Sequence, residues 1–332
     1  MKAIVQTKYG PLDVLKLEEI QKPTPSDDDV LVEVHAASVN FNNLAFVRGE
    51  PFLARLWTGL LKPKHKIPGS DIAGRVQAVG RNVKQFKLGD EVFGDISQCG
   101  YGAFAEYVSV PENALALKPA NISFEEAAAV PQAAVVALQG LRDKGQIETG
   151  QKVLIYGASG GIGTFAVQIA KSFGAEVTGV CSARNLEMVR SIGADHVIDY
   201  TQEDFTQNGQ HYDLILATAG YRSIFDYRRA LSPKGIYVAT GGSMRGPKAM
   251  TQILQALFLG PWISMAGSKK LGNWHLRIDR EDLVFVKELI EAGKVKPVID
   301  RRYALSEVAE ALRYYGEGHA RGKVVITLGH VM

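Results

Sequence analysis

The sequence predicts an α/β fold in which a doubly wound parallel sheet is inserted between two segments of an irregular β domain. Short β-forming runs separated by proline, glycine and acidic turns fill residues 1–120, and short strands return near the C-terminus. From Lys152 onward, strand patterns alternate with helix patterns, which is typical of a parallel sheet. The 332 residues exceed the roughly 100–200 residues of an ordinary domain. We therefore expect one domain over 1–120 and 279–332, and a second over 121–278.

In the first domain, alternating or clustered β-formers predict strands at 2–6, 16–20, 30–39 and 103–110, and a further strand is expected directly after a turn at Gly89-Asp90. Glycine-rich corners are expected at Gly69, Gly74 and Gly80. An alanine-rich helix is expected over 122–141. Ser123 is its N-cap, and Pro131 should break or restart it.

In the second domain, we expect strands at 152–157, 176–181, 196–200, 212–218 and 235–242, and helices at 161–174, 185–193 and 224–233. Residues 243–270 are the hardest to interpret, with an apolar helix expected around 251–259. An amphipathic helix capped by Asp279 and ended by Gly293 follows, and the last strand is expected at 322–328.

The composition excludes several classes of protein. Hydrophobic residues make up 46% and charged residues 22% of the chain, which excludes wholesale disorder. The 38 Lys and Arg residues nearly balance 35 Asp and Glu residues, so nucleic acid is not expected as a partner. The two cysteines, Cys99 and Cys181, are too few for a disulfide framework or a multi-thiolate zinc cluster. We see no membrane span or secretory leader, and we expect a cytoplasmic location.

The strongest chemical signal is the glycine-rich turn between the strand at 152–157 and the helix that starts at 161. Gly160 and Gly161 let the backbone approach a pyrophosphate, and Gly163 lets the helix pack closely on the strand. The helix N-terminus adds unpaired N–H donors. The candidate cofactor-binding residues are therefore Ser159, Gly160, Gly161, Ile162 and Gly163. The alternative is a tight strand–helix turn that binds nothing.

The end of the next strand decides the cofactor. A carboxylate there would bind the ribose hydroxyls of NAD, but this sequence continues Ser182-Ala183-Arg184. Ser182 can donate a hydrogen bond and Arg184 can pair with a 2′-phosphate, which favours NADPH over NADH. Tyr200 ends the third strand and is a candidate neighbour of the same phosphate or of the adenine. The alternatives are a solvated Arg184 and a Tyr200 that only packs at the sheet edge.

The chain resembles the medium-chain dehydrogenase/reductase superfamily, in its zinc-free, quinone oxidoreductase-like (zeta-crystallin-like) branch. The resemblance covers nearly the whole chain in order and spacing, and it rests on VHAASVN, PGSDIAGRVQAVG, FKLGDEVFG, GAFAEYVSVP, EEAAAVPQAAVVALQGL, GASGGIGTFAVQIAK and HARGKVVI. It implies a GroES-like β domain plus a Rossmann domain, with the active site in the cleft between them. It also adds Asn40, Ala219, Gly241, Gly242 and Lys323 to the candidate cofactor-binding residues.

The resemblance implies that the protein holds no zinc. Zinc-dependent relatives carry a cysteine near the end of the VHAASVN strand and a histidine–glutamate pair further on, where this sequence has Asn40 and Ser70-Asp71. The four-cysteine structural lobe is also missing, and the seven histidines lack the spacing of metal ligands.

Asn40 is the candidate catalytic residue. It resembles the branch's cleft asparagine, and its amide could hydrogen-bond a developing oxyanion; equally, it could merely tie two loops together. Three places depart from the branch: Asn42-Asn43 stands where an aspartate is common, Val136 where a threonine is frequent, and Ala217 where an aspartate usually ends the fourth strand. Each departure removes a polar group from the expected cleft.

A hydrophobic substrate pocket is expected on the segment 50–66, which is apolar with basic flanks. Phe52 and Trp57 could line a lid over the substrate, and Trp274 is a further candidate. The alternative is a surface helix that packs its apolar stripe onto the β domain. No proton donor is identified: no spacing places Tyr101 or Tyr107 over the nicotinamide.

Together, these observations predict an NADPH (NADP)-dependent reductase that transfers hydride to an α,β-unsaturated carbonyl (an enone) or a quinone without zinc. One alternative is zinc-free reduction of a ketone or aldehyde, and another is an NADPH-binding protein that has lost catalysis. Dimers are common in the branch, so a homodimer is one expected state.

Overall fold

A computed structural model describes residues 1–52, 55–219, 222–240, 269–273, 277 and 279–329. The chain divides into two compact units. Unit 1 comprises Met1–Ala133, Ile278–Glu291 and Pro297–Met332, and unit 2 comprises Ala134–Arg277 and Ala292–Lys296. The sequence placed the division at 120/121 and 278/279, so unit 1 extends further into the helical segment than expected.

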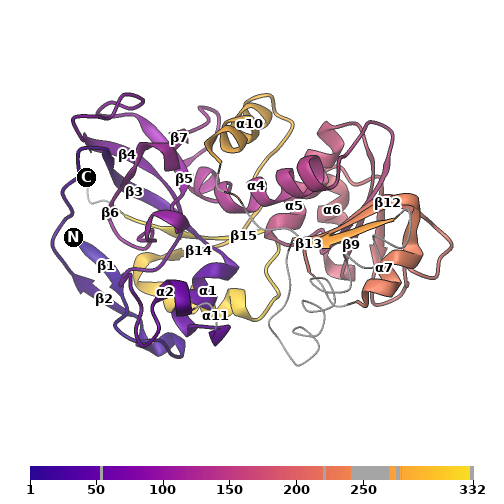
Figure 1. Cartoon of the computed structure of the whole chain (residues 1–332), viewed down its shortest axis with the longest axis horizontal. Coiled ribbons are helices and arrows are strands. Elements are labelled where there is room, and N and C mark those ends of the chain that lie inside the picture. Colours follow the sequence, from indigo (N-terminus) through magenta and orange to yellow (C-terminus); the bar gives the residue numbers. More distant parts are fainter. Residues whose placement is uncertain (53–54, 220–221, 241–268, 274–276, 278, 330–332) are drawn as a thin grey trace. The chain divides into compact units, whose positions relative to one another are not determined.

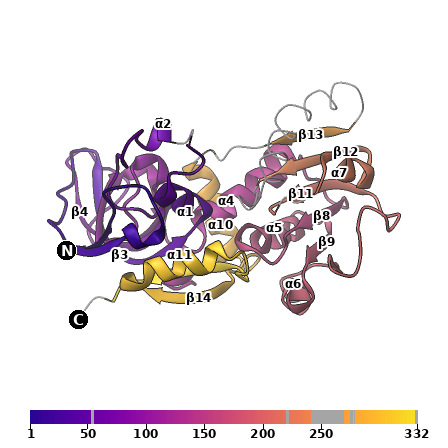
Figure 2. The same cartoon turned by 90° about the horizontal axis from the view of Figure 1, so that it is seen from below.

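Unit 1 is built on a mixed sheet in the order β14-β15-β3-β4-β5-β7, with β6 also paired to β3 and a separate β1–β2 pair (Figure 1). Its strands are β1 (Lys2–Val5), β2 (Lys16–Glu19), β3 (Asp29–Val39), β4 (Asp71–Val79), β5 (Glu91–Asp95), β6 (Tyr107–Pro111), β7 (Ala116–Leu117), β14 (Ile299–Ala304) and β15 (Lys323–Thr327). Its helices are α1 (Phe41–Arg48), α2 (Arg55–Thr58), α3 (Phe124–Ala128), α10 (Arg280–Glu291) and α11 (Val308–Gly316). Figure 2 shows α11 lying along β14.

Strand β4 was not expected, because Gly69, Gly74 and Gly80 indicated corners. In the structure, Gly74 lies inside β4 and pairs with Val34 of β3, and a Cβ at position 74 would lie 2.0 Å from the Glu33 carbonyl oxygen. The glycine thus permits close approach of two backbones rather than a turn. Strand β5 begins at Glu91, directly after the Gly89-Asp90 turn, as the sequence predicted. Strand β6 begins at Tyr107 rather than at Ala103.

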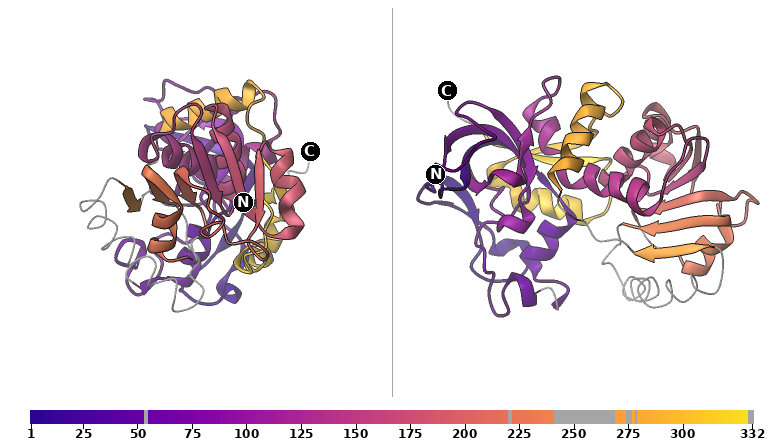
Figure 3. Two further views of the ribbon diagram at one scale, coloured as in Figure 1. Left: turned by 90° about the vertical axis from the view of Figure 1, so that its right-hand side faces the viewer. Right: turned by 45° about the horizontal axis from the view of Figure 1, so that its top comes forward.

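Unit 2 is a six-stranded, all-parallel sheet in the order β10-β9-β8-β11-β12-β13. The strands are β8 (Lys152–Tyr156), β9 (Glu176–Cys181), β10 (His196–Asp199), β11 (Tyr212–Ala217), β12 (Leu231–Ala239) and β13 (Lys270–Asn273). The helices are α5 (Gly161–Ser172), α6 (Leu186–Ser191) and α7 (Ile224–Ala230), and Figure 3 shows β12 and β13 side by side at one edge. The predicted doubly wound α/β class with a second, β-rich unit is confirmed.

Helix and strand signals were accurate where the local pattern was strong. Helix α3 ends at Ala128 and α4 (Pro131–Gln139) starts at the proline, as expected for a restart. The Glu281 N–H donates to Asp279 Oδ1 at 2.9 Å, which caps α10. Helix α7 ends three residues before its predicted end, because Leu231 pairs with Tyr212 of β11 and already belongs to β12.

The described helices contain none that is long and apolar enough to cross a membrane. The expected helix at 251–259 lies outside the described residues.

Candidate functional site

The glycine-rich turn joins β8 to α5 as predicted. Gly160 is the N-cap of α5 and has extended backbone angles, with no side chain capping the helix. The N–H groups of Gly161, Ile162 and Gly163 have no acceptor among the described residues. Free N–H groups and the positive end of the helix dipole make this helix start suitable for a phosphate.

Two glycines keep the turn tight. Gly157 has a φ of +85°, and its N–H donates to Val180 O of β9 at 3.0 Å. A Cβ on Gly163 would lie 2.1 Å from the Gly157 carbonyl oxygen, so only glycine lets α5 pack this closely. Among the described residues, a Cβ on Gly160 would contact only the Gly157 oxygen, at 3.5 Å, so none of them crowds this side of the turn.

The carboxyl ends of β9 and β10 bring the other predicted cofactor residues to the same edge. Asp199 pairs with Cys181 in the parallel register, and the Tyr200 N–H donates to Cys181 O at 3.2 Å. Ser182 and the exposed Arg184 follow Cys181, and Tyr200 is half exposed. Their proximity agrees with a shared binding region, although direct contact of each residue with a cofactor stays a prediction.

The sequence reasoning missed two polar side chains at this edge. Thr218 follows β11 and donates from Oγ1 to Tyr156 O at 3.0 Å and to Gly157 O at 3.2 Å. Asn185 donates from Nδ2 to the hydroxyls of Ser159 and Ser182. The adjacent Ala219 lies against the turn, because a Cβ on Gly157 would be 2.9 Å from the Ala219 Cβ. Gly241 and Gly242 lie outside the described residues.

In unit 1, Asn40 lies at the end of β3 and belongs to a buried polar cluster. Lys323 of β15 donates from Nζ to Asn40 Oδ1 and, at 3.3 Å, to Val39 O. Asn40 Nδ2 donates to Ser70 Oγ at 3.3 Å. Strands β15 and β3 bring Lys323 to Asn40, since Val324 pairs with Val39. The amide therefore ties two segments together, as in the structural alternative; its catalytic role stays a prediction.

The same cluster holds two carboxyls and one ammonium group. Asp71 and Asp95 face each other across β4 and β5, and Lys323 Nζ lies 3.8 Å from Asp71 Oδ2. Burial raises the pKa of Asp71 to about 7; the Lys323 charge opposes the shift and Asp95 adds to it. Burial also raises the pKa of Asp95 and lowers that of Lys323. Asp71 Oδ1 is buried without a hydrogen-bond partner in the described part of the chain.

The departure at Asn43 has a structural role. Its Oδ1 accepts the Asn40 backbone N–H at 2.8 Å, and its Nδ2 donates to Ser70 Oγ at 3.1 Å. An amide can make both contacts because it carries an acceptor and a donor. The other two departures, Val136 and Ala217, are buried and add no polar group.

The candidates for the substrate pocket are only partly described. Phe52 is 64% exposed, and the Arg55 guanidinium lies 5.3 Å from its ring centroid. Trp57 lies in α2, but its side chain is not described, and Trp274 lies outside the described residues. The lid and the surface helix both stay open as interpretations.

Tyr101 and Tyr107, to which the sequence assigned no role, both contact residues of unit 1. The Tyr101 ring stacks on Phe46 with ring centroids 4.4 Å apart, and burial raises its pKa to about 12. The Tyr107 hydroxyl donates to Glu33 Oε1 at 3.0 Å. Neither observation identifies a proton donor.

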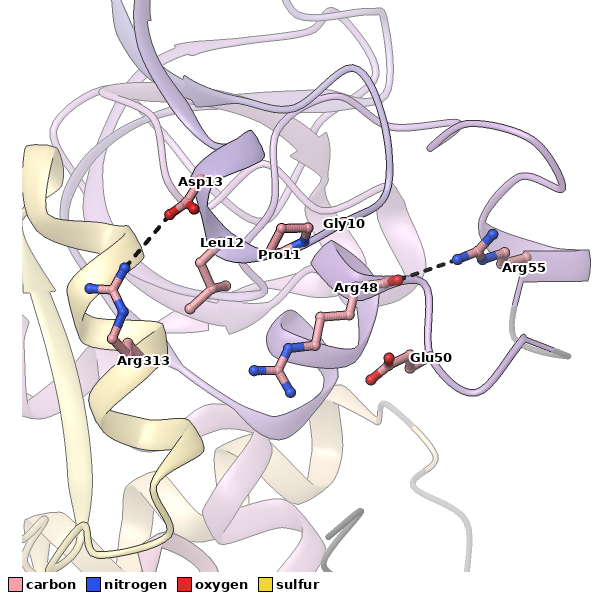
Figure 4. Close-up of a pocket in the computed structure, with 8 residues that line it drawn as sticks. All are labelled: Gly10, Pro11, Leu12, Asp13, Arg48, Glu50, Arg55 and Arg313. Carbon is pink, nitrogen blue, oxygen red and sulfur yellow. Dashed lines mark hydrogen bonds and ion pairs between the residues drawn. The ribbon is translucent and has the colours of Figure 1, made fainter. Parts of the chain in front are cut away.

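Unit 1 also contains a pocket of about 660 Å³, shown in Figure 4, which none of the predicted site residues lines. Arg313 lies 3.8 Å from Asp13, and Arg55 donates from Nε to Gly49 O and from Nη2 to Arg48 O. Arg55 thus binds the carbonyls at the end of α1, and the charges around the pocket nearly balance.

Within the described residues, no group of three or more His, Cys, Asp or Glu side chains is placed to hold a metal ion. His196 instead contacts Glu176 at 3.1 Å, and the His35 ring stacks on Phe124. Zinc independence itself stays a prediction.

Comparison with known proteins places this geometry in a family. Residues 26–120 match the alcohol dehydrogenase GroES-like domain, and residues 192–326 match the zinc-binding dehydrogenase family model. A 2-methylene-furan-3-one reductase from Solanum lycopersicum is 35% identical over 98% of this chain and 79% of its own length. The chloroplastic NADPH-dependent alkenal/one oxidoreductase of Arabidopsis thaliana is 34% identical over the same shares.

Among solved structures, the quinone oxidoreductase from Coxiella burnetii is 28% identical and has a TM-score of 0.85, with 99% of each chain covered. The two family models, the near-complete coverage of the relatives and the glycine-rich turn before α5 all indicate the same family. The chain therefore belongs to the medium-chain dehydrogenase/reductase superfamily, in its quinone oxidoreductase-like branch, and its cofactor is a pyridine nucleotide.

Proposed function

We propose that the protein is an NADPH-dependent reductase that transfers hydride to an α,β-unsaturated carbonyl or a quinone without zinc. The observation that carries the proposal is the open start of α5 beside Ser182 and Arg184, at a strand end that bears no carboxylate. The names of the relatives, an alkenal/one oxidoreductase that depends on NADPH among them, support the same substrate class.

The residues present fit NADPH. The N–H groups of Gly161, Ile162 and Gly163 offer donors to a pyrophosphate, and no described residue lies closer than 3.5 Å to the position that a Cβ on Gly160 would take. Asn185 Oδ1 is buried and unpartnered among the described residues, so a nucleotide hydroxyl or amino group would supply its missing donor. Arg184 would pair with the 2′-phosphate. When bound, the cofactor supplies the hydride.

In the proposed reaction, Asn40 would donate a hydrogen bond from its amide to the substrate carbonyl oxygen, where negative charge develops. Hydride addition to an enone leaves an enolate, and solvent water would supply the proton that completes the saturated carbonyl product. Lys323 has only donors, so its contact with Asn40 Oδ1 fixes which end of the amide is the oxygen. The buried ammonium also provides positive charge close to that amide. We propose zinc independence because this cluster already contains its own cation and has amide and hydroxyl groups at positions 40 and 70.

Turnover with several acceptors tests the proposal. Purified protein is mixed with NADPH and a panel of enones, quinones, ketones and aldehydes, and loss of cofactor absorbance is followed after dialysis against a chelator. We expect turnover of enones or quinones and a saturated carbonyl product from the enones. An allylic alcohol would instead show carbonyl reduction. Tight NADPH binding without turnover on any acceptor would support the non-catalytic alternative and contradict our proposal.

We also propose, on sequence grounds alone, a cytoplasmic location and a homodimer. Cell fractionation and light scattering test these two statements. A membrane-bound pool, or a monomer at all concentrations, would contradict them.

A further inference from the structure

Asn185 lies where two parts of the cofactor region meet. It is the last residue of the 3-10 turn Ala183–Asn185, which follows β9 and leads into α6. Its side chain is 4% exposed, and its backbone N–H donates to Ser182 O at 2.9 Å. The backbone bond and the burial hold the side chain in one place.

The amide of Asn185 bridges the phosphate turn and the end of β9. Its Nδ2 donates to Ser159 Oγ at 3.0 Å and to Ser182 Oγ at 3.2 Å. Ser159 is in the turn before α5, and Ser182 is the residue after β9. A single NH₂ group therefore positions two of the hydroxyls expected to face the cofactor.

This arrangement determines where the hydroxyl protons point. A serine hydroxyl has one proton to donate and two lone pairs that accept. Because each Oγ accepts from Asn185, each hydroxyl keeps its proton for another acceptor, and neither hydroxyl has an acceptor among the described residues. A phosphate oxygen is an acceptor only, so both hydroxyls are prepared to donate to a phosphate.

The oxygen of the Asn185 side chain is a second observation that favours a ligand beside this residue. Asn185 Oδ1 is buried and has no partner in the described part of the chain. A buried acceptor without a donor is unfavourable, which a nucleotide or an ordered water would relieve.

We propose that Asn185 is a positioning residue for NADPH, which orients the Ser159 and Ser182 hydroxyl protons toward phosphate oxygens and thereby favours the 2′-phosphorylated cofactor. The inference rests on the proposed NADPH-dependent function. NADH shares the pyrophosphate near Ser159 but lacks the 2′-phosphate near Ser182. Loss of the bridging amide therefore weakens NADPH binding more than NADH binding.

The substitution Asn185→Asp gives the sharpest test. A carboxylate accepts only, so it would draw both hydroxyl protons toward itself and add a negative charge beside the phosphates. If the amide were instead oriented with its oxygen toward the serines, Asn185→Asp would preserve those contacts. The two orientations therefore give opposite results.

The dissociation constants of NADPH and NADH are measured by titration calorimetry for the wild type, Asn185→Asp, Asn185→Ala and the control Gln210→Glu. Gln210 is exposed and precedes β11, so the control adds the same charge at the amino-terminal side of the sheet. We expect about a 10-fold or larger loss of NADPH affinity in both Asn185 variants, largest for Asp, because charge-assisted hydrogen bonds are lost. We expect a smaller loss for NADH and wild-type affinity in the control.

A coupling measurement guards against a variant that fails to fold. In a Ser159→Ala/Ser182→Ala background, Asn185→Ala should change NADPH affinity by less than about twofold, because the hydroxyls it orients are gone. Wild-type NADPH affinity in Asn185→Asp, or equal losses for NADPH and NADH, overturns the inference. A wild-type protein that does not bind NADPH overturns the proposed cofactor as well, which separates the two failures.

Discussion

At the scale of single residues, Asp71 and Asp95 are the least expected feature of unit 1. Carboxylates directly opposite on neighbouring strands repel each other, and here both are buried with Lys323 as the cation beside them. The Ser38 hydroxyl and the Gln132 N–H donate to Asp71 Oδ2, and the Gln132 amide donates to Asp95 Oδ2. Hydrogen bonds therefore offset part of the cost of burying these charges.

The raised pKa of Asp71 predicts that this group by itself contributes a loss of stability as pH rises from about 4 to about 8. The folded state keeps the Asp71 proton up to about pH 7, whereas an unfolded aspartate releases it near pH 4. Because the folded state then binds one proton more at this carboxyl, the Asp71 contribution to the free energy of unfolding falls as pH rises, by up to about 4 kcal/mol. Asp71→Asn cannot titrate at this position, so the midpoint temperature of the wild type should decrease relative to that of the variant as pH rises over this range.

Thermal unfolding at pH 5, 6, 7 and 8 checks this prediction. The variant also removes the carboxylate beside Lys323, which changes the midpoint temperature at every pH. The change of the midpoint temperature with pH is therefore compared between the two proteins, and not the midpoint temperature itself. Equal slopes for the wild type and Asp71→Asn would show that Asp71 titrates normally.

Arg184 carries the prediction about cofactor choice. Arg184→Asp replaces the guanidinium with a charge that repels the 2′-phosphate, so NADPH affinity should fall by about 1.5–3 kcal/mol, roughly 10- to 150-fold. NADH affinity should be retained, and Ser182→Ala should have a milder effect. Fluorescence titration with both cofactors measures the ratio of the NADPH and NADH dissociation constants. An unchanged NADPH affinity in Arg184→Asp would mean that another group recognises the 2′-phosphate.

At the scale of elements, the start of α5 combines two separate requirements on glycine. Gly163 is needed because α5 packs on the backbone of the turn, whereas no described residue crowds Gly160, which has ordinary backbone angles. The two positions look alike in the sequence, but only their surroundings show the difference.

A matched pair of substitutions separates these requirements. Gly163→Ala should lower the free energy of unfolding by about 1–3 kcal/mol, because its Cβ would overlap the Gly157 carbonyl oxygen. Gly160→Ala should cost at most about 1 kcal/mol of stability but weaken NADPH binding, since its methyl group occupies the space beside the turn. Denaturant unfolding and cofactor titration measure the two effects, and a fully stable Gly163→Ala would contradict the close packing.

At the scale of the whole molecule, two units share one chain, and the predicted phosphate turn lies entirely within unit 2. A ligand that binds only the folded state stabilises it by about 2.7 kcal/mol at 100 times its dissociation constant. For a unit of this size, each kcal/mol added to the free energy of unfolding raises the midpoint temperature by about 2–4 °C. NADPH should therefore raise the midpoint temperature by roughly 5–10 °C, and NADH at the same concentration should raise it less. Differential scanning fluorimetry makes the comparison, and equal shifts would argue against selection of the 2′-phosphate.

The sequence predicted the parallel sheet and the phosphate turn well, because each signal is local. The glycines from 157 to 163 follow an apolar strand directly and precede an apolar helix. The sequence-based prediction was wrong at β4, where Gly74 indicated a corner but the strand continues. The glycine is needed because the Glu33 backbone, which belongs to a distant segment, approaches it closely. The prediction also missed Asn185, since an asparagine after a strand carries no signal until Ser159 is found beside it.

By itself, the order of residues determined the alternation of strands and helices, the helix start offered to a phosphate, and the absence of a carboxylate after β9. These depend on backbone preferences of neighbours in the chain. Only the tertiary structure decided that Lys323 reaches Asn40, 283 positions away, and that Asp71 and Asp95 share one buried ammonium group. The pairing of β15 with β3 and of β4 with β5 brings these groups together, and pairing between distant strands leaves no local trace in the sequence.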